Sequence, residues 1–327
     1  MKKTDFVRIL SESRLILPPL SGFTDYPYRQ ILARYRPAFI ITEMVNAKAV
    51  LMNNKKTMEM LKQVKGDHKN GAQLLGDDPL EMAQAARIMQ SLGFDYIDIN
   101  MGCTVKKVIR KGQGVALMRD QQRACAIVES VSTSVDIPVT VKMRLGYSDS
   151  TNDVISFAEQ LEESGATALT VHGRSAEKKF SAHIDYEAIS AVARSVSLPI
   201  IANGGITGKN ATYILEKTQA TAVMPGRSII GNPWIIKEAA SSLKKASYQE
   251  PTLKERKDVA FDHVSLVSDY FGESSGVVRF RKVFPRYFET CKNLKILKTD
   301  VKEIHTLSDV HLLLSRIREA EGHIMYG

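Results

Sequence analysis

The sequence predicts an α/β fold, a (β/α)8 TIM barrel followed by a smaller all-helical C-terminal domain. Short apolar, β-branched runs alternate with turns and amphipathic helical stretches from the N-terminus onwards. Eight such runs fall within roughly 235 residues, the usual size of this kind of barrel. After the polar stretch 244–252 the patterns are helical throughout. We therefore predict a barrel over residues 1–247 and a helical domain over residues 248–327.

Each element follows from its local pattern. In the stretch 79–92, Leu80, Ala83 and Ala86 recur near helical spacing and Gly93 supplies a stop signal. The predicted strands are 14–19, 39–43, 71–75, 96–100, 139–144, 168–172, 200–203 and 220–224. The predicted barrel helices include 27–35, 79–92, 119–134, 153–164 and 186–195. The predicted helices of the tail are 253–271, 274–291 and 307–321.

A doubly wound sheet is the rival architecture for alternating strands and helices. Its usual signal is a GxGxxG turn after the first strand. Here that turn reads Ser21-Gly22-Phe23-Thr24-Asp25, which lacks the glycine pattern. The barrel is therefore favoured.

Composition narrows the class of protein. The chain has 44% hydrophobic and 25% charged residues, which is typical of globular domains and excludes disordered, collagen-like and coiled-coil classes. It has no apolar run long enough for a membrane helix, and charged residues interrupt any signal-peptide core, so we expect a cytoplasmic protein. Three distant cysteines without a CxxC pair argue against a disulfide framework or a metal site. The net charge of +9 favours an anionic partner without identifying one.

Polar residues occupy the ends of most predicted strands. Read in order, these ends are Pro19, Glu43, Gln73, Asn100, Lys142, His172, Asn203 and Gly226. Barrel interiors prefer branched apolar side chains, and barrel enzymes build their sites at the C-terminal ends of the strands. The set therefore indicates a functional site at the barrel mouth, although any single member could be structural.

Glycines follow the last two strands, in Asn203-Gly204-Gly205 and Gly226-Arg227-Ser228. Loops at these barrel positions commonly bind phosphate through backbone N–H groups, and Arg227 could add a charged contact. The alternative is that these glycines only form tight turns.

A thiol and a basic loop follow the fourth strand. Cys103 comes directly after it, and the loop 106–114 contains Lys106 and Lys107 but no acidic residue. From spacing alone, Cys103 could equally be a small buried hydrophobe, and the loop a solvated face.

Taken together, the motifs resemble those of the tRNA-dihydrouridine synthases. The resemblance runs in order through residues 17–231 and continues into the tail. Its motifs are Pro19-Leu20-Ser21-Gly22-Phe23-Thr24-Asp25, residues 98–107, Val141-Lys142-Met143-Arg144, Thr170-Val171-His172-Gly173-Arg174, Asn203-Gly204, Gly226-Arg227, Gly231-Asn232-Pro233-Trp234 and Arg279-Phe280-Arg281-Lys282. The resemblance implies an FMN-dependent enzyme with a catalytic barrel and a helical tRNA-binding domain.

The resemblance also implies roles for individual residues. Those expected to bind FMN are Pro19, Leu20, Ser21, Gln73, Lys142, His172, Asn203, Gly204, Gly205, Gly226 and Arg227. Those expected to bind the substrate are Asn100, Arg144, Arg174, Lys106, Lys107, Arg279, Lys282 and Arg286. Cys103 matches the family's proton donor. Reduction of the uracil C5–C6 bond needs a hydride at C6, which flavin N5 supplies, and a proton at C5. A thiol of ordinary pKa is protonated at neutral pH and can supply that proton.

The sequence departs from the family pattern at several positions near the site. Thr104 replaces a proline, Gly205 replaces an acidic residue, and Pro225 replaces an aliphatic residue. The stretch 175–181 also lacks the usual glutamine and tyrosine. None of these changes removes a named catalytic group.

The tail carries a basic segment. Residues 277–298 contain seven Lys and Arg against one acidic residue. Phe280, Phe284 and Phe288 are spaced to face a helical core, whereas Arg279, Lys282 and Arg286 would share another face suited to phosphates. A solvated helix face is the alternative, and Pro285 is expected to kink the helix.

We predict an FMN-dependent enzyme that uses NADPH to convert uridines of tRNA to 5,6-dihydrouridine. We expect it to be a monomer without metal or membrane partners. A flavin-dependent dihydroorotate or dihydropyrimidine dehydrogenase acting on a free pyrimidine is the second reading, and it would not need the basic tail. A barrel that only binds RNA is the third, against which Cys103, Lys142 and His172 argue. The sequence does not select the uridine position, NADPH over NADH, or the oligomeric state.

Overall fold

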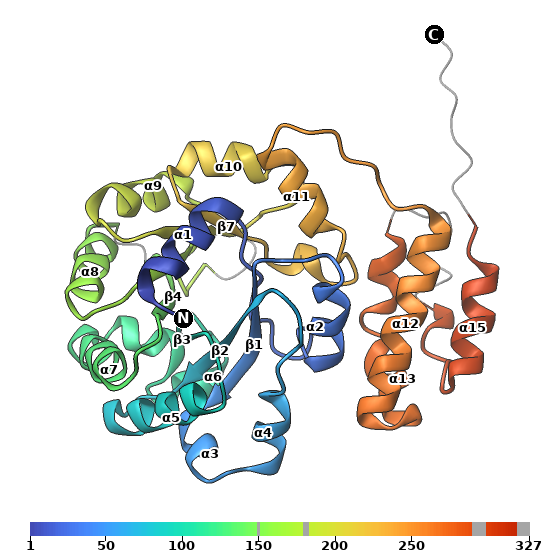
Figure 1. Cartoon of the computed structure of the whole chain (residues 1–327), viewed down its shortest axis with the longest axis horizontal. Coiled ribbons are helices and arrows are strands. Elements are labelled where there is room, and N and C mark those ends of the chain that lie inside the picture. Colours follow the sequence, from blue (N-terminus) through green and yellow to red (C-terminus); the bar gives the residue numbers. More distant parts are fainter. Residues whose placement is uncertain (149–150, 179–182, 290–298, 319–327) are drawn as a thin grey trace.

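A computed structural model describes residues 1–148, 151–178, 183–289 and 299–318. Seven parallel strands form one sheet in sequential order, with helices outside it and a helical region beside it (Figure 1). The strands are β1 (Phe39–Asn46), β2 (Lys69–Leu75), β3 (Tyr96–Met101), β4 (Val139–Arg144), β5 (Ala168–His172), β6 (Ile200–Asn203) and β7 (Ala222–Met224). The fold is the predicted TIM-barrel type.

The outer helices alternate with the strands as predicted. They are α1 (Lys3–Ser13), α2 (Tyr26–Ala33), α3 (Ala47–Leu51), α4 (Lys55–Met60), α5 (Pro79–Ser91), α6 (Lys106–Ile109), α7 (Gln121–Ser134), α8 (Thr151–Glu163), α9 (Tyr186–Ser195), α10 (Ala211–Thr218) and α11 (Ile235–Leu243), with 3-10 helices η1 (Gly114–Met118) and η2 (Arg227–Ile229). Four of them begin in the same way. The side-chain carboxylate of the residue before the helix accepts a hydrogen bond from the backbone N–H three residues later. These N-caps are Asp25, Asp78, Asp120 and Asp185.

The strand predicted over 14–19 is largely absent. Leu15 forms a single parallel bridge with Val223 of β7, and no named strand includes this segment. Arg14 adopts φ 52°, outside the extended region. Pro18 and Pro19 have no N–H to donate, so the hydrogen-bond ladder cannot continue through them. The segment still completes the core, since Leu15 and Leu17 are buried.

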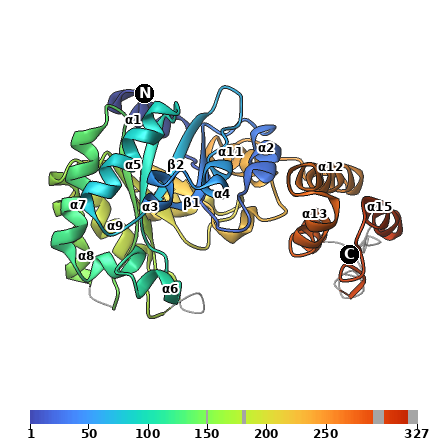
Figure 2. The ribbon, with the colours of Figure 1, turned by 90° about the horizontal axis from the view of Figure 1, so that it is seen from below.

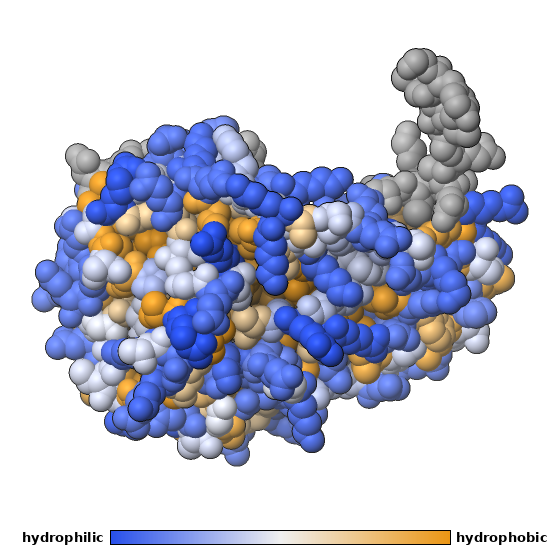
Figure 3. Space-filling view, turned by 45° about the horizontal axis from the view of Figure 1, so that its top comes forward, coloured by the Kyte–Doolittle hydropathy of each residue, from blue (hydrophilic) through white to orange (hydrophobic). Residues whose placement is uncertain are grey.

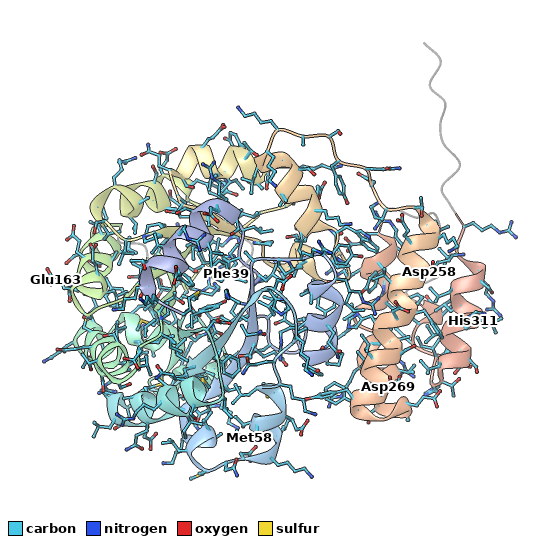
Figure 4. The ribbon with its side chains drawn as sticks, in the orientation of Figure 1. Phe39, Met58, Glu163, Asp258, Asp269 and His311 are labelled. Carbon is cyan, nitrogen blue, oxygen red and sulfur yellow. The ribbon has the colours of Figure 1, made fainter. Side chains whose placement is uncertain are left out.

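An aromatic cluster fills the end of the barrel that α1 covers. The ring of Phe6 on α1 lies 4.9 Å from that of Phe39 and 5.3 Å from that of Tyr96. Figure 4 shows Phe39 inside the barrel, in contrast to Glu163 at its outer rim. All three rings are fully buried, so this end of the barrel is closed by packing.

Gly71 is the tightest point of this cluster and gives a stability prediction. A Cβ atom at this position would lie 2.1 Å from Cζ of Tyr96. Overpacking of this kind costs about 1–3 kcal/mol, so we expect Gly71→Ala to lower the free energy of unfolding by an amount near the upper end. Urea unfolding measures it, and adding Tyr96→Leu should recover part of the loss. An unchanged midpoint in Gly71→Ala would contradict the packing.

The C-terminal helical region contains α12 (Leu253–Phe271), α13 (Glu273–Phe280), η3 (Phe284–Phe288) and α15 (Leu307–Arg316). The predicted helix 274–291 is wrong in extent, because α13 ends at Phe280 and a 3-10 turn containing Pro285 follows. Proline has no N–H for a helical bond and its ring clashes with the preceding turn. Residues 290–291, and 319–321 of the last predicted helix, lie outside the described residues. Phe280, Phe284 and Phe288 are buried in one cluster, as predicted.

The barrel and the helical region share a core at the seam between them. The ring of Tyr28 on α2 stacks on that of His263 on α12 at 4.7 Å, and His263 Nδ1 lies 3.0 Å from the Tyr287 hydroxyl. Ile230 and Trp234, from the end of the barrel, join the same buried cluster. The helical region therefore packs against one side of the barrel (Figure 2).

The exterior is largely polar on the face that Figure 3 shows, where hydrophilic side chains cover most of the barrel and the helical region. Among the described residues, no helix combines the length and the apolar character needed to cross a bilayer.

Candidate active site

A cavity of about 340 Å³ opens at the C-terminal ends of the strands. Its rim includes Thr104 and Val105, which directly precede α6, and α6 lies at the opposite end of the barrel from α1 (Figure 2). Volumes of roughly 300–1,000 Å³ are usual for small-molecule and cofactor sites. We call this space the mouth cavity.

Most residues predicted for the site line the mouth cavity together. From the first half of the barrel and its centre come Pro19, Leu20, Ser21, Gln73, Lys142 and His172. The last two strand ends and their loops contribute Asn203, Gly204, Gly205, Gly226 and Arg227. Cys103, Asn100, Arg144 and Arg174 also line it, whereas Lys106, Lys107, Arg279, Lys282 and Arg286 do not. Residues from distant parts of the chain are thus brought to one opening.

A chain of hydrogen bonds runs under the cavity from a buried carboxylate to the thiol loop. Asp98 accepts hydrogen bonds from Thr140 Oγ1 at 2.6 Å and from Gln73 Nε2 at 2.7 Å. Gln73 Oε1 accepts from Asn100 Nδ2 at 3.0 Å. Asn100 Oδ1 in turn accepts from the backbone N–H of Cys103 at 3.0 Å. The position of Cys103 is therefore set through Asn100 by groups on three neighbouring strands.

Burial controls the charge of Asp98, the carboxylate beneath the mouth cavity. Desolvation raises the pKa of Asp98 to about 6, against the hydrogen bonds from Thr140 and Gln73. Asp98 thus takes up a proton more readily when the chain is folded than when it is unfolded, so its contribution to stability increases as the pH falls through 6.

The mouth cavity is strongly cationic. Lys142, Arg144, Arg174 and Arg227 line it, and no Asp or Glu is among the described residues that do. Lys142 Nζ donates to Asn203 Oδ1 at 3.1 Å and makes no salt bridge with Glu43 or Asp98 within the described part of the chain. Burial, reinforced by Arg144, lowers the pKa of Lys142 to about 8. The arrangement favours an anionic ligand, because the lining offers no carboxylate to neutralise these charges.

His172 is neutral in this setting. Burial, with the surrounding positive charges of Lys142 and the arginines, lowers its pKa to about 2. Its Nε2 lies 3.4 Å from Nη1 of Arg174. His172 therefore acts as a neutral hydrogen-bonding ring at neutral pH.

Cys103 keeps its proton at neutral pH. Burial is the largest influence and raises the pKa of the thiol, against a smaller effect of the positive charge of Arg144. The guanidinium of Arg144 is held beside this loop, with Nε donating to the carbonyl of Gly102 at 2.9 Å. A protonated thiol beside a fixed guanidinium suits a general acid better than a nucleophile.

The two glycine loops leave backbone accessible at one side of the cavity. Gly205 adopts φ +62°, and a Cβ there would meet Cδ1 of Ile184 at 2.3 Å. Ile184 therefore occupies the space that a side chain at position 205 would need, which accounts for glycine at this departure from the family pattern. A Cβ on Gly226 would meet nothing within 4 Å, so the approach to the first turn of η2 is open. These loops and the cations fit a phosphate group.

One strand end does not join the site. The register of β1 shifts between Ile41 and Met44. Met44 consequently lines the mouth cavity, whereas Glu43 faces a different cavity and accepts a hydrogen bond from the N–H of Gly22. Met44 was not predicted as a site residue, because strand alternation does not reveal a bulge. Pro18 and Gly102 also line the cavity and were not predicted.

The predicted cations outside the barrel core are spread over several surfaces. Lys106 and Lys107 are exposed on α6, next to the cavity rim. Arg279 and Lys282 line the cavity that Glu43 faces, while Arg286 lines a further one and pairs with Glu289 at 2.5 Å. The expectation of one shared face for these three is wrong, because the helix that would have aligned them ends at Phe280.

The described residues contain no cluster of three or more His, Cys, Asp or Glu side chains placed to hold a metal ion.

Comparison with known proteins gives a consistent result. A family model described as dihydrouridine synthase matches residues 16–321. A probable tRNA-dihydrouridine synthase of Rickettsia bellii is 37% identical, over 83% of this chain and 84% of the relative. The tRNA-dihydrouridine synthase B of Pasteurella multocida is 36% identical, over 85% and 84%. The protein of the same name from Pseudomonas aeruginosa is 33% identical, over 94% and 92%.

Proposed function

We propose, from the premise that this chain belongs to the dihydrouridine synthase family, that it reduces uridines of tRNA to 5,6-dihydrouridine with FMN as bound cofactor and NADPH as reductant. The observation that carries the proposal is the mouth cavity, in which four cations and a protonated thiol converge without any lining carboxylate. A tRNA substrate also places the enzyme in the cytoplasm. We propose that residues 1–247 form the catalytic domain and residues 248–327 the tRNA-binding domain.

The cofactor would be held by two groups of residues. Pro19, Leu20, Ser21, Gln73, Lys142 and His172 would contact the ring system. Asn203, Gly204, Gly205, Gly226 and Arg227 would bind the phosphate end, where glycine backbone and a guanidinium are both available. The four cations offset the charge of a phosphate, and Lys142 would also stabilise negative charge on the ring.

The remaining residues of the mouth cavity would act on the uracil. Bound and reduced FMN supplies the hydride that goes to C6. The Cys103 thiol gives its proton to C5, so the C5–C6 double bond gains two hydrogens and the thiol is left as a thiolate, which solvent reprotonates. Asn100 and Arg144 would orient the ring, since both contact the loop that carries Cys103. Arg174, Lys106 and Lys107 would contact the RNA around the target.

Identification of the bound flavin tests this proposal. We expect purified protein to release FMN rather than FAD, because the glycine loops offer one terminal phosphate site. Chromatography of the released flavin identifies it, and turnover with NADPH on unmodified tRNA, compared with free uracil or orotate, establishes the substrate. Bound FAD would contradict the cofactor assignment. Turnover on free pyrimidine but not on tRNA would favour the pyrimidine dehydrogenase reading.

Charge reversal in the tail gives a second prediction. We expect replacement of Arg279, Lys282 and Arg286 by Glu to weaken tRNA binding and to flatten the dependence of log K on log salt by roughly one unit per lost phosphate contact. Reversal of Lys2, Lys3 and Arg8, at the opposite end of the barrel, is the matched control and should leave the slope unchanged. If the tail variant and the control have the same dependence of log K on log salt, the tail cations face solvent and do not contact phosphates of the tRNA.

A further inference from the structure

The largest of the described cavities lies at the seam between the barrel and the helical region. It has a volume of about 880 Å³ and differs from the mouth cavity in every lining residue. On one side are the loop that precedes α2, the end of β1, and α4; on the other are α12 and α13. Figure 1 shows α2 on the side of the barrel that faces these two helices, and the Tyr270 hydroxyl of α12 donates to the carbonyl of Glu59 on α4 at 2.9 Å. We call this space the seam cavity.

The two cavities adjoin at two places in the backbone, where consecutive residues line different cavities. Ser21 lines the mouth cavity and Gly22 the seam cavity; on β1, Met44 lines the mouth cavity and Glu43 the seam cavity. The two cavities therefore lie on opposite sides of the same two stretches of backbone, and an RNA strand that crosses this wall can place one base in the mouth cavity and a neighbouring base in the seam cavity.

The lining of the seam cavity has the chemistry of a nucleotide site. Five Phe and Tyr rings line it, those of Phe23, Tyr26, Tyr270, Phe271 and Phe280. Four cations also line it, Lys55, Lys56, Arg279 and Lys282. Proteins bind unpaired RNA bases by stacking them on aromatic side chains while cations follow the phosphates. The aromatic rings have no part in the reduction proposed above.

Of the three carboxylates that line the seam cavity, Glu59 is paired with Lys62, and the other two provide a means of selecting the base. Asp25 Oδ1 accepts from the N–H of Tyr28 at 3.0 Å, and Glu43 Oε1 accepts from the N–H of Gly22. Within the described part of the chain, the second oxygen of each makes no hydrogen bond. Burial, with a smaller effect of Glu43, raises the pKa of Asp25 to about 6, so the Asp25 carboxylate is an acceptor at neutral pH. Lys282 donates to the carbonyl of Gly22 and retains two further N–H groups.

This combination of groups distinguishes among the four bases. Guanine presents two adjacent donors, N1–H and the N2 amino group, beside the O6 acceptor. A carboxylate accepts from both donors and an ammonium group donates to O6. Adenine and cytosine instead present a ring-nitrogen acceptor beside their amino group, which a carboxylate repels. Uracil has one donor between two acceptors.

We propose, building on the function proposed above, that the seam cavity binds a guanine base of the substrate tRNA that neighbours the reduced uridine. Asp25 and Glu43 read its donor edge, Lys282 contacts O6, and the aromatic rings stack on it. The enzyme then selects its uridine by the neighbouring base as well as by the shape of the tRNA.

Inosine substitution tests this assignment directly. Inosine lacks only the N2 amino group, so the guanosines of an unmodified substrate tRNA are replaced by inosine one at a time. Binding of each RNA to the full-length protein is measured. We expect one position to lose about tenfold in affinity, the usual effect of removing a hydrogen bond to a charged group.

Two variants assign the effect to the carboxylates. Glu43→Gln keeps an acceptor for Gly22 and Asp25→Asn keeps one for Tyr28, so each preserves the local fold while replacing a free acceptor by an amide. In at least one of them the affinity ratio of guanosine to inosine RNA should fall to about one. Glu129→Gln, on α7 at the outside of the barrel, is the matched control and should keep the tenfold ratio.

The binding measurement separates this proposal from the proposed function. Wild-type affinity that is indifferent to inosine at every position would overturn the guanine assignment, whether or not dihydrouridine is formed. Retention of the tenfold ratio in both Asp25→Asn and Glu43→Gln would overturn it as well. A guanosine preference that is lost in at least one of these two variants, in a protein that forms no dihydrouridine, would uphold the assignment and refute the proposed reaction.

Discussion

Cys103→Ala is expected to slow the reduction of tRNA uridine by roughly 10²–10⁴-fold, the usual cost of losing a general acid. The variant removes the thiol proton, yet the Asn100 side chain can still accept from the backbone N–H of residue 103. The glycine loops are untouched. Flavin content and reduction of the flavin by NADPH should therefore stay near wild-type values.

The decisive measurement is single-turnover oxidation of prereduced enzyme by unmodified tRNA without oxygen. Because burial raises the pKa of the thiol, the wild-type rate should stay level through neutral pH and fall only above the ordinary thiol value of about 8.5. Cys125→Ala, at a half-buried thiol on α7, is the matched control. A Cys103→Ala rate within a few-fold of wild type would refute the proton-donor role.

Lys142→Met is expected to slow the reduction of bound flavin by NADPH by roughly 10²–10³-fold, the effect of removing a charged donor from a site where negative charge develops. Methionine approximates the length of the side chain but removes the ammonium that donates to Asn203. Flavin should still bind, because the glycine loops and Arg227 remain.

A redox titration checks the same assignment independently of turnover. The midpoint potential of the flavin in Lys142→Met should move to more negative values, by about 30 mV for each tenfold loss in stabilisation of the two-electron-reduced form. Lys69→Met, at the start of β2 and away from the mouth cavity, should leave the potential unchanged. An unaltered potential in Lys142→Met would show that its charge does not act on the ring.

The barrel could be predicted well because its signals are local. The strands β4, β5 and β6 have the predicted bounds, and parallel strands bring their C-terminal ends to one place whatever the loops do. The residues predicted at those ends, from Gln73 to Asn203, consequently share one cavity. The resemblance to a family supplied their expected roles, which composition and spacing alone left open.

The features that were missed depend on geometry that periodicity does not encode. The register shift in β1 moves Glu43 out of the mouth cavity, and an alternating pattern reads the same with or without a bulge. The helix α13 ends at Phe280 and Pro285 lies in the separate 3-10 helix η3, so the tail cations separate. The seam cavity combines residues 22–60 with residues 263–283, which the packing of α2 against α12 brings together.

The packing of Tyr28 on His263 has a consequence for how the molecule unfolds. Ile230 and Trp234, which precede the helical region in the chain, are buried among its side chains. Neither part can then lose its structure without exposing aromatic surface of the other. Heating should produce one cooperative transition, seen alike by near-ultraviolet circular dichroism and by release of the cofactor, with no plateau between two separate melting events.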